Sequence, residues 1–244
     1  MRLLALLAVT LAATTARAAG IDRDSLLTDS PAVPAVGTVR VTGGALGTDN
    51  SNGGASPSGA SSVSGSIGWT PFANLHADVG AYAQVGASGP SARVRYQFLS
   101  QAEHGLDLSA GVRLKTVGFH PNNGEFEALL AAGRRFGKFE LVLNGVLGQE
   151  LGGEQGKDLE IKGFAGYRFN ESVRAGLDSR LQAELADEQK SPTRIGRDYD
   201  LTAGPAISWL IGQTVQVQAL VGVAQPKKTN LTAPVGVVSA SIDF

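Results

Sequence analysis

The sequence predicts an all-β fold, a transmembrane antiparallel up-and-down β-barrel of twelve strands. Apolar and polar residues alternate with a period of two along most of the chain, which indicates strands with two different faces. These alternating runs are roughly 9 to 12 residues long, a length that suits a tilted strand crossing a bilayer. The connections between them are alternately short and long, as in barrels that span a membrane.

Twelve segments carry the alternation, and no domain boundary separates them. They are centred on residues 38–46, 61–70, 74–85, 91–99, 106–117, 125–136, 139–150, 159–169, 172–185, 199–210, 214–224 and 235–244. In residues 215–224 (VQVQALVGVA), for example, valine and alanine occupy one face, and Gln216, Gln218 and Gly222 occupy the other. We expect the apolar face to meet lipid and the polar face to line a lumen.

The connections divide into two classes, which predict the two ends of the barrel. After the even-numbered strands they are short: TPFA, SQAEHGL, FGK, NE and IGQ. After the odd-numbered strands they are mostly longer and rich in Gly, Pro and charge: GTDNSNGGASPSGA, ASGPS, GFHPNNG, LGGEQGKD, ADEQKSPTRIGRD and QPKKTNLTAP. Short turns on one side and long loops on the other are typical of an up-and-down transmembrane barrel.

The first 36 residues precede this pattern. Residues 1–19 combine an early arginine, a short apolar run and the small-residue pattern Ala16-Arg17-Ala18, which predicts an export signal peptide cleaved near Ala19 or Gly20. Residues 20–36 read as a proline-stiffened lead-in, which we expect to lie outside the wall. Residues 37–244 form the predicted barrel.

Composition narrows the class of function. The chain has 21 basic and 22 acidic residues, so it lacks the basic excess of a nucleic-acid-binding protein. It has no cysteine, so a disulfide framework cannot stabilise it despite the predicted export. Backbone pairing and packing must hold the fold together.

Aromatic residues gather at the predicted short-turn end. This placement predicts a girdle at one membrane interface. Its members are Trp69, Tyr96, Phe98, Phe136, Phe139, Tyr167, Phe169, Trp209 and Phe244, and Phe72 belongs to the same end.

The C-terminal strand ends on Phe244, with Ile242 and Ala240 at alternate positions before it. Together with the topology of the mature chain, this ending resembles the outer-membrane β-barrel proteins of Gram-negative bacteria, without pointing to one family among them. The resemblance implies outer-membrane localisation, contact with lipid, and reading of Phe244 by the outer-membrane assembly machinery. Ser239 departs from the glycine often found at that position. The oligomeric state stays open.

Charged residues of both signs fall on the predicted inward face. The candidates for lining the lumen are Arg93, Arg95, Arg113, Lys115, Glu140, Glu160, Lys162, Arg168, Arg174, Asp178 and Arg180. Inside a closed barrel they must pair with one another or line a wet channel, and the arginines could favour anions at a constriction. Inward glycines such as Gly176, Gly204 and Gly222 favour an open lumen over a plug, or mark bends in the wall.

The sequence offers little for catalysis. His76, His104 and His120 show no metal-ligand spacing, and no HExxH or GxSxG motif is present. We therefore expect no enzyme activity, no metal and no cofactor.

The prediction that fits these features best is a narrow passive, porin-like channel or a structural protein of the outer membrane. Two alternatives stay open. One is a secreted soluble β-barrel or sandwich that binds a ligand. The other is an outer-membrane barrel enzyme or adhesin that acts through its long loops.

Overall fold

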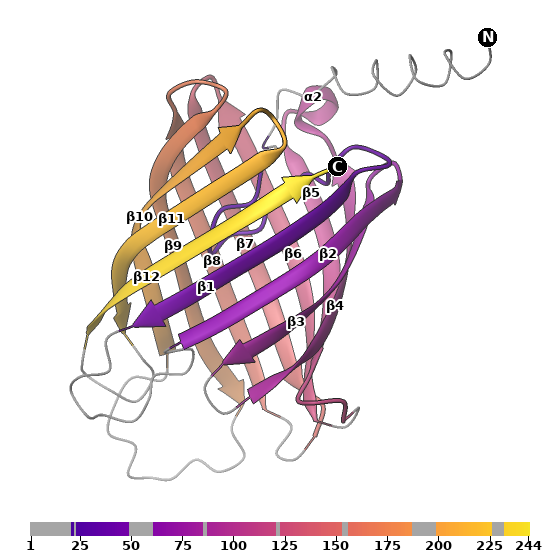
Figure 1. Cartoon of the computed structure of the whole chain (residues 1–244), viewed down its shortest axis with the longest axis vertical. Coiled ribbons are helices and arrows are strands. Elements are labelled where there is room, and N and C mark those ends of the chain that lie inside the picture. The colour runs from indigo at the N-terminus through magenta and orange to yellow at the C-terminus, as the bar shows by residue number, and fades with distance from the viewer. Residues whose placement is uncertain are drawn as a thin grey trace.

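The computed structural model describes residues 21, 23–48, 61–84, 87–120, 123–152, 156–186, 199–225 and 232–244. These residues form one closed ring of antiparallel strands (Figure 1). The predicted fold class and the count of twelve strands are confirmed. The predicted signal peptide, residues 1–19, lies outside the described residues.

The strands follow the order of the chain around the ring, and β1 pairs with β12 to close it. Their bounds are β1 Val39–Thr48, β2 Ser61–Phe72, β3 Leu75–Gln84, β4 Ala87–Leu99, β5 Asp107–Thr116, β6 Gly124–Phe136, β7 Phe139–Glu150, β8 Lys157–Arg168, β9 Val173–Ala186, β10 Tyr199–Ile211, β11 Val215–Gln225 and β12 Ala233–Asp243. A short helix, α2, spans Gln101–His104 in the turn between β4 and β5. Among the described residues, no helix is long and apolar enough to cross a membrane.

The strand bounds agree closely with the alternation, and the largest difference is at β4. This strand begins at Ala87, four residues before the predicted start. The sequence around Pro90 reads as a turn, but Pro90 pairs with Ala81 of β3. Proline lacks only its N–H group, so a strand pair supported on both sides continues past it.

Closure leaves no open sheet edge along the ring. The N–H of Phe244 donates to the carbonyl oxygen of Val39 at 2.9 Å, and Arg40 binds Asp243 with 2.6 Å between Nε and Oδ1. These contacts join the first and last strands at the end where the C-terminus lies (Figure 1). In a hydrocarbon environment every backbone polar group needs such a partner.

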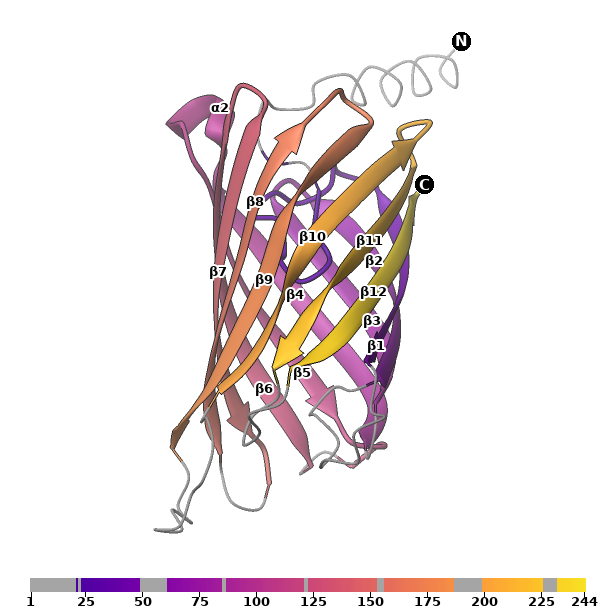
Figure 2. The same ribbon diagram turned by 90° about the vertical axis from the view of Figure 1, so that its left-hand side faces the viewer.

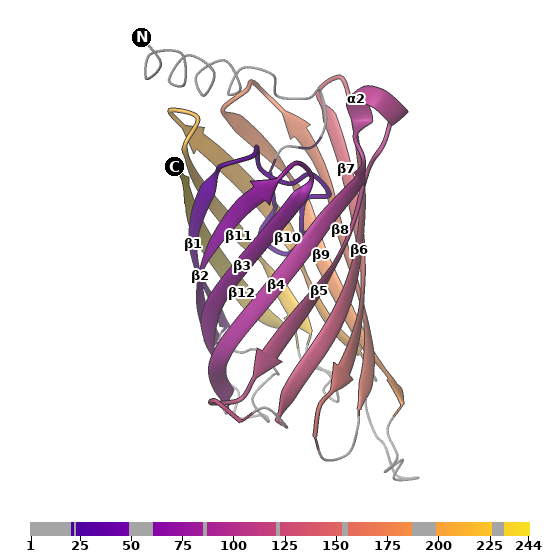
Figure 3. The same ribbon diagram turned by 90° about the vertical axis from the view of Figure 1, so that its right-hand side faces the viewer.

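The outer face of the ring is apolar and the inner face is mixed. Exposed valine, leucine and isoleucine side chains recur on alternate positions of the strands; Val221, near the middle of β11, is 71% exposed. Its neighbour Leu220 points inward and is buried. The ring therefore presents an apolar band outward, the surface that a bilayer requires. Figures 2 and 3 show the strands tilted around the barrel from two further sides.

Two of the inward glycines allow neighbouring strands to approach closely. A Cβ atom at Gly176 would lie 2.3 Å from the carbonyl oxygen of Ala165, and one at Gly204 would lie 2.4 Å from that of Val221. A side chain at either position would collide with the neighbouring strand. The two glycines therefore stand where the neighbouring backbone approaches too closely for a side chain.

Candidate functional site

The lead-in occupies the inside of the barrel. We call residues 21–36, as far as they are described, the lumen segment. It enters from the short-turn end, descends as a loop within the ring and returns to begin β1; the indigo trace inside the barrel shows this path from three sides (Figures 1, 2 and 3). The segment forms no strand of the wall, but it lies inside the ring and not on the exterior of the barrel, so the expectation that it lies outside the wall is wrong. The preference for an open lumen over a plug is wrong as well.

Donors on the wall bind the carbonyl groups of the lumen segment. Arg174 of β9, 1% exposed, donates to the carbonyl oxygens of Arg23 and Asp24. Gln218 of β11 also donates to the carbonyl of Asp24, at 2.7 Å. From the other side of the ring, Arg95 of β4 donates to the carbonyl of Ser30 at 3.0 Å. Buried backbone polar groups need hydrogen-bond partners, and these side chains supply them to an irregular segment.

Acceptors on the wall bind its N–H groups. Asp107 accepts from the N–H of Ile21 at 2.9 Å. Asp178 accepts from the N–H of Leu27 at 2.9 Å and from a hydroxyl, Thr28 Oγ1, at 2.6 Å. The amide of Asn144 accepts from the N–H of residue 29 at 2.7 Å and donates to its carbonyl at 2.9 Å. These contacts come from β5, β9 and β7, so several sides of the wall hold the segment.

Two carboxylates of the segment complete the polar contacts. Asp24 lies 3.3 Å from Arg95 and 3.6 Å from Arg40, nitrogen to oxygen. Asp29 lies 2.5 Å from Arg93 and 3.6 Å from Lys162. Burial raises the pKa of each carboxyl group, but the facing cations lower it further, so both pKa values lie below that of an ordinary aspartate. Both groups are therefore charged while the segment is docked.

Apolar contacts lie between these polar ones. Leu26 and Leu27 pack against an apolar patch on the inner face of β10, β11 and β12, which consists of Ala206, Leu220, Ala224, Val235 and Val237. Ile21 packs against Val142 and Phe164 on β7 and β8. The inner wall is thus complementary to the segment in polarity as well as in hydrogen bonding.

A buried ion cluster supports the donor Arg174. Glu140 of β7 accepts from Arg168 Nε at 2.7 Å and from Arg174 Nη1 at 3.0 Å, and all three side chains are almost inaccessible to solvent. The guanidinium of Arg174 also lies over the ring of Phe164, 5.0 Å from its centroid. These contacts fix the orientation in which Arg174 reaches the segment.

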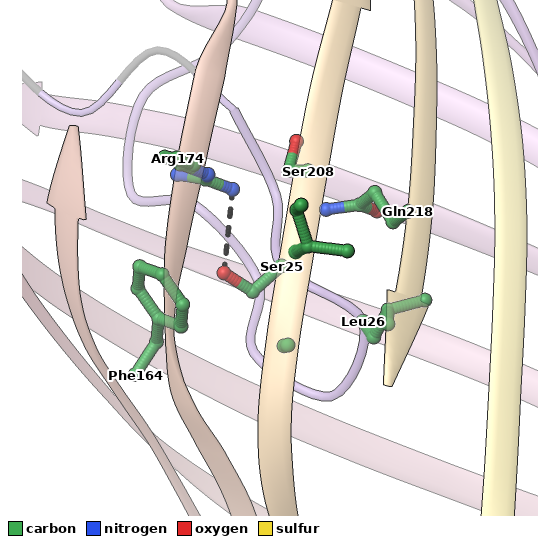
Figure 4. Close-up of a pocket in the computed structure, with 8 residues that line it drawn as sticks. Ser25, Leu26, Phe164, Arg174, Ser208 and Gln218 are labelled. Atoms are coloured by element: carbon green, nitrogen blue, oxygen red, sulfur yellow. Dashed lines mark hydrogen bonds between the residues drawn. The ribbon is translucent and has the colours of Figure 1, made fainter. Parts of the chain in front are cut away.

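Little space remains around the docked segment. Figure 4 shows a pocket to which the segment contributes Ser25 and Leu26 and the wall contributes Phe164, Arg174, Ser208 and Gln218. Arg174 donates to Ser25 Oγ across it at 3.3 Å (Figure 4). The segment is therefore in direct contact with this part of the wall.

Beyond the segment, toward the long-loop end, the predicted lumen residues form a ladder of ion pairs. Lys115 binds Glu125 and Glu127, and Arg113 also binds Glu127. On the adjoining wall, Glu160 binds Arg180 and Lys162. All eleven predicted lumen residues thus have polar partners inside the ring, some on the wall and some on the segment.

The predicted girdle residues lie on strand ends or turns at the short-turn end. Trp69, Tyr96, Phe98, Phe136, Phe139, Phe169, Trp209 and Phe244 are exposed large side chains, whereas Tyr167 is half-buried between Phe139 and Phe169, with ring centroids 5.1 and 5.2 Å away. Their position at a membrane interface stays a prediction.

The sequence analysis missed the residues through which the segment and wall meet. These are Asp24 and Asp29 on the segment and Arg40 and Asn144 on the wall. Gln216 and Gln218 were assigned to the inward face, but their contact with the Asp24 carbonyl was not foreseen. One signal was present: DRDSLLTDSP places two leucines and three aspartates in a supposed linker. A solvated linker has no need of Leu26 and Leu27, and acidic residues suit a lumen rich in arginine.

The histidines do not form a reactive constellation within the described chain. His76 is buried, with Nδ1 2.9 Å from Thr70 Oγ1 and Nε2 4.0 Å from Asp78. His104 lies in α2, and His120 lies in the loop after β5. No group of three or more potential metal ligands occurs among the residues that the structure describes.

Solved outer-membrane proteins share this architecture. The structure is similar to the KdgM porin, with a TM-score of 0.56 at 14% identity over 84% of this chain and 99% of that one. It is similar to the NanC porin, with a TM-score of 0.59 at 8% identity over 84% of this chain and 100% of that one. The COG4313 outer membrane channel from Pseudomonas putida F1 gives a TM-score of 0.59 at 12% identity, over 92% of this chain and 100% of that one.

At these sequence identities, the structural similarity shows the fold alone. No protein-family model matches the sequence, and no curated protein matches it either. The chain therefore has the fold of an outer-membrane β-barrel. Its activity has to be inferred from its own residues.

Proposed function

We propose that this protein is a porin-like channel of the outer membrane whose lumen is closed by its own N-terminal segment. One observation carries the proposal: the ring is complete without the segment, because every strand pairs with two neighbours and the segment contributes no strand. A wall that can enclose a length of polypeptide is wide enough for a water-filled path once that polypeptide leaves. Twelve strands fall between the filled eight-stranded barrels and the open porins in width.

The way the segment is held supports a closure that can open. Its contacts with the wall are hydrogen bonds, ion pairs and small apolar contacts, and the chain has no cysteine that could fix it covalently. The segment leads into the wall at β1. It could therefore swing toward the short-turn end while the barrel stays intact. The similar structures are two porins and an outer membrane channel, which supports the same interpretation.

Two further parts of the proposal concern delivery to the membrane. Residues 1–19 would direct export and be removed. The assembly machinery would read Phe244, which is 75% exposed at the end of the chain. Outer-membrane lipid would cover the apolar band. A non-enzymatic role agrees with the histidine positions.

A variant without the docking contacts tests the channel. In a full-length linker variant, residues 24–31 (DSLLTDSP) are replaced by a Gly/Ser run of equal length, which is flexible and lacks the two leucines and two aspartates. In planar bilayers we expect long-lived conductance steps from the linker variant and rare, brief openings from the wild type. A linker variant that assembles, shown by its strand circular dichroism, but conducts no current would contradict the channel and leave a structural role.

Acid should open the wild-type channel, because Asp24 and Asp29 have lowered pKa values only in the docked state. A released aspartate titrates near pH ~3.9, so docking is stabilised above that pH and loses this stabilisation as pH falls through the docked pKa values. We expect an unchanged open fraction from about pH 8 to about pH 5 and more openings below about pH 4.

The linker variant is the control, since it lacks both carboxylates. A pH effect that the linker variant shares with the wild type would arise from groups of the wall and not from Asp24 or Asp29. Opening of the wild type as the pH rises from 5 to 8 would contradict the role of the two aspartates.

A further inference from the structure

One carboxylate of the lumen segment occupies a site built by the wall. Asp29 Oδ1 lies 2.5 Å from Arg93 Nη1 on β4, and Oδ2 lies 3.6 Å from Lys162 Nζ on β8. The neighbouring β7 supplies the Asn144 amide to the backbone of the same residue. Two cations and an amide from three strands thus converge on one anionic residue.

We propose that this wall site is a receptor for the carboxylate group of a solute, and that the solute opens the channel by replacing Asp29. The inference rests on the proposed channel function and names its ligand class and its trigger. Asp29 then acts as an internal competitor, which holds the segment in place until a free carboxylate takes its partners.

The site lies toward the long-loop end of the segment's contacts with the wall. A small pocket there is lined by Asp29, Arg93, Arg113, Glu127 and Lys162. The side chains of Asp29 and Arg93 are 17% and 20% exposed, whereas that of Glu140, deeper in the lumen, is inaccessible. Among the described residues, Asp29 is therefore nearer to the long-loop end than the buried cluster is, and it is more exposed.

Charge favours an anion in this pocket. Its lining contains three cations and two carboxylates, and one of those carboxylates belongs to the movable segment. Arg93 keeps Asp78 as a wall partner, and Lys162 keeps Glu160. When Asp29 leaves, each of these two cations loses one of its two acidic partners, so an incoming carboxylate restores the original pairing. A neutral solute of the same size cannot.

Exchange of the carboxylate acts on docking because Asp29 lies on the segment between other anchors. Thr28 and Leu27 bind Asp178 directly beside it, and Ser30 binds Arg95 on its other side. A ligand that binds only the undocked state shifts the equilibrium toward that state by its differential affinity. Solute binding and channel opening are therefore coupled, because both depend on the equilibrium between the docked and the undocked lumen segment.

Calorimetry on the purified full-length protein tests the binding site, with succinate as the probe and succinamide as its neutral counterpart. We expect succinate to bind and succinamide not to bind. Asp29→Asn should raise the affinity for succinate about tenfold, because the competitor is lost while the cations stay. Lys162→Gln should abolish binding, whereas Lys157→Gln, an equal loss of charge at the exposed start of β8, should preserve it.

A lower succinate affinity in Asp29→Asn than in the wild type would overturn the competition. Equal binding by Lys162→Gln and Lys157→Gln would overturn the site. Strand circular dichroism of each variant checks that the barrel has assembled.

Conductance tests the trigger. Succinate on the long-loop side should raise the open fraction of the wild type at constant ionic strength, and the linker variant should be open with or without it. If phosphate raised the open fraction as much as succinate does, the assignment of the site to carboxylates would be overturned. If added chloride did so, the effect of succinate would be one of charge screening and the site would be overturned. A conducting linker variant beside a wild type that ignores succinate would overturn the inference and leave the channel standing. An assembled but silent linker variant would overturn the channel itself.

Discussion

Glu140→Gln should lower the free energy of unfolding by about 3–5 kcal/mol, because it leaves buried guanidinium groups without their carboxylate. Glu140 lies between Arg168 and Arg174, and all three side chains are 4% exposed or less. Glutamine keeps the shape of the side chain but has no charge and only one acceptor oxygen. Denaturant unfolding in lipid vesicles, followed by tryptophan fluorescence, measures the change.

Glu171→Gln is the matched control. Glu171 binds the same Arg168 at 3.3 Å, but its side chain is 87% exposed. A solvated ion pair contributes about 0–1 kcal/mol, so this variant should unfold almost as the wild type does. A similar decrease in the free energy of unfolding in both variants would show that burial does not determine how much these ion pairs contribute to stability. Glu140→Gln should also raise the open fraction, since Arg174 then loses a contact that orients it toward the lumen segment.

Val221→Arg should cost about 2–4 kcal/mol or prevent assembly, because it places a charge on the lipid face near the middle of the bilayer. Val221 lies near the centre of β11, opposite Gly236, and is 71% exposed. Folding yield into vesicles and denaturant unfolding measure the effect.

Two neighbouring positions give the comparison. Val217 also faces outward, but it pairs with Trp209 at the aromatic end, so Val217→Arg should cost only about 0–1 kcal/mol at that depth. Gln218 faces inward, and Gln218→Arg should leave the barrel assembled while disturbing the contact with the Asp24 carbonyl. Equal costs at Val217 and Val221 would contradict the placement of the bilayer along the strands.

The wall could be read from the sequence because a strand reveals its faces locally. Each inward or outward position follows from its neighbour, so Val221 and Gly222 are assigned to opposite sides without knowledge of the rest of the fold. Turn and loop lengths then fix the direction of each strand. The start of β4 could not be predicted in this way. Pro90 indicates a turn when the sequence is considered alone, but in the barrel it is a paired strand residue.

The residues of the site were found only in part. Arg93, Arg95, Lys162 and Arg174 appeared as inward charges, because alternation places them there. Their partners could not be inferred in the same way, since Asp24 and Asp29 lie in a segment with no period. Between Asp24 and Gln218, or between Leu27 and Asp178, well over a hundred residues of chain intervene.

The sequence by itself determined the class of fold, the number of strands and the two faces of the wall, because alternation and turn chemistry are local properties. The tertiary structure alone decided what fills the ring. Curvature brings side chains from β1, β4, β5, β7, β8, β9 and β11 around one short segment, and only that closure gives its backbone groups and two aspartates their partners. The occupant of a lumen is a property of the closed ring, which no single strand encodes.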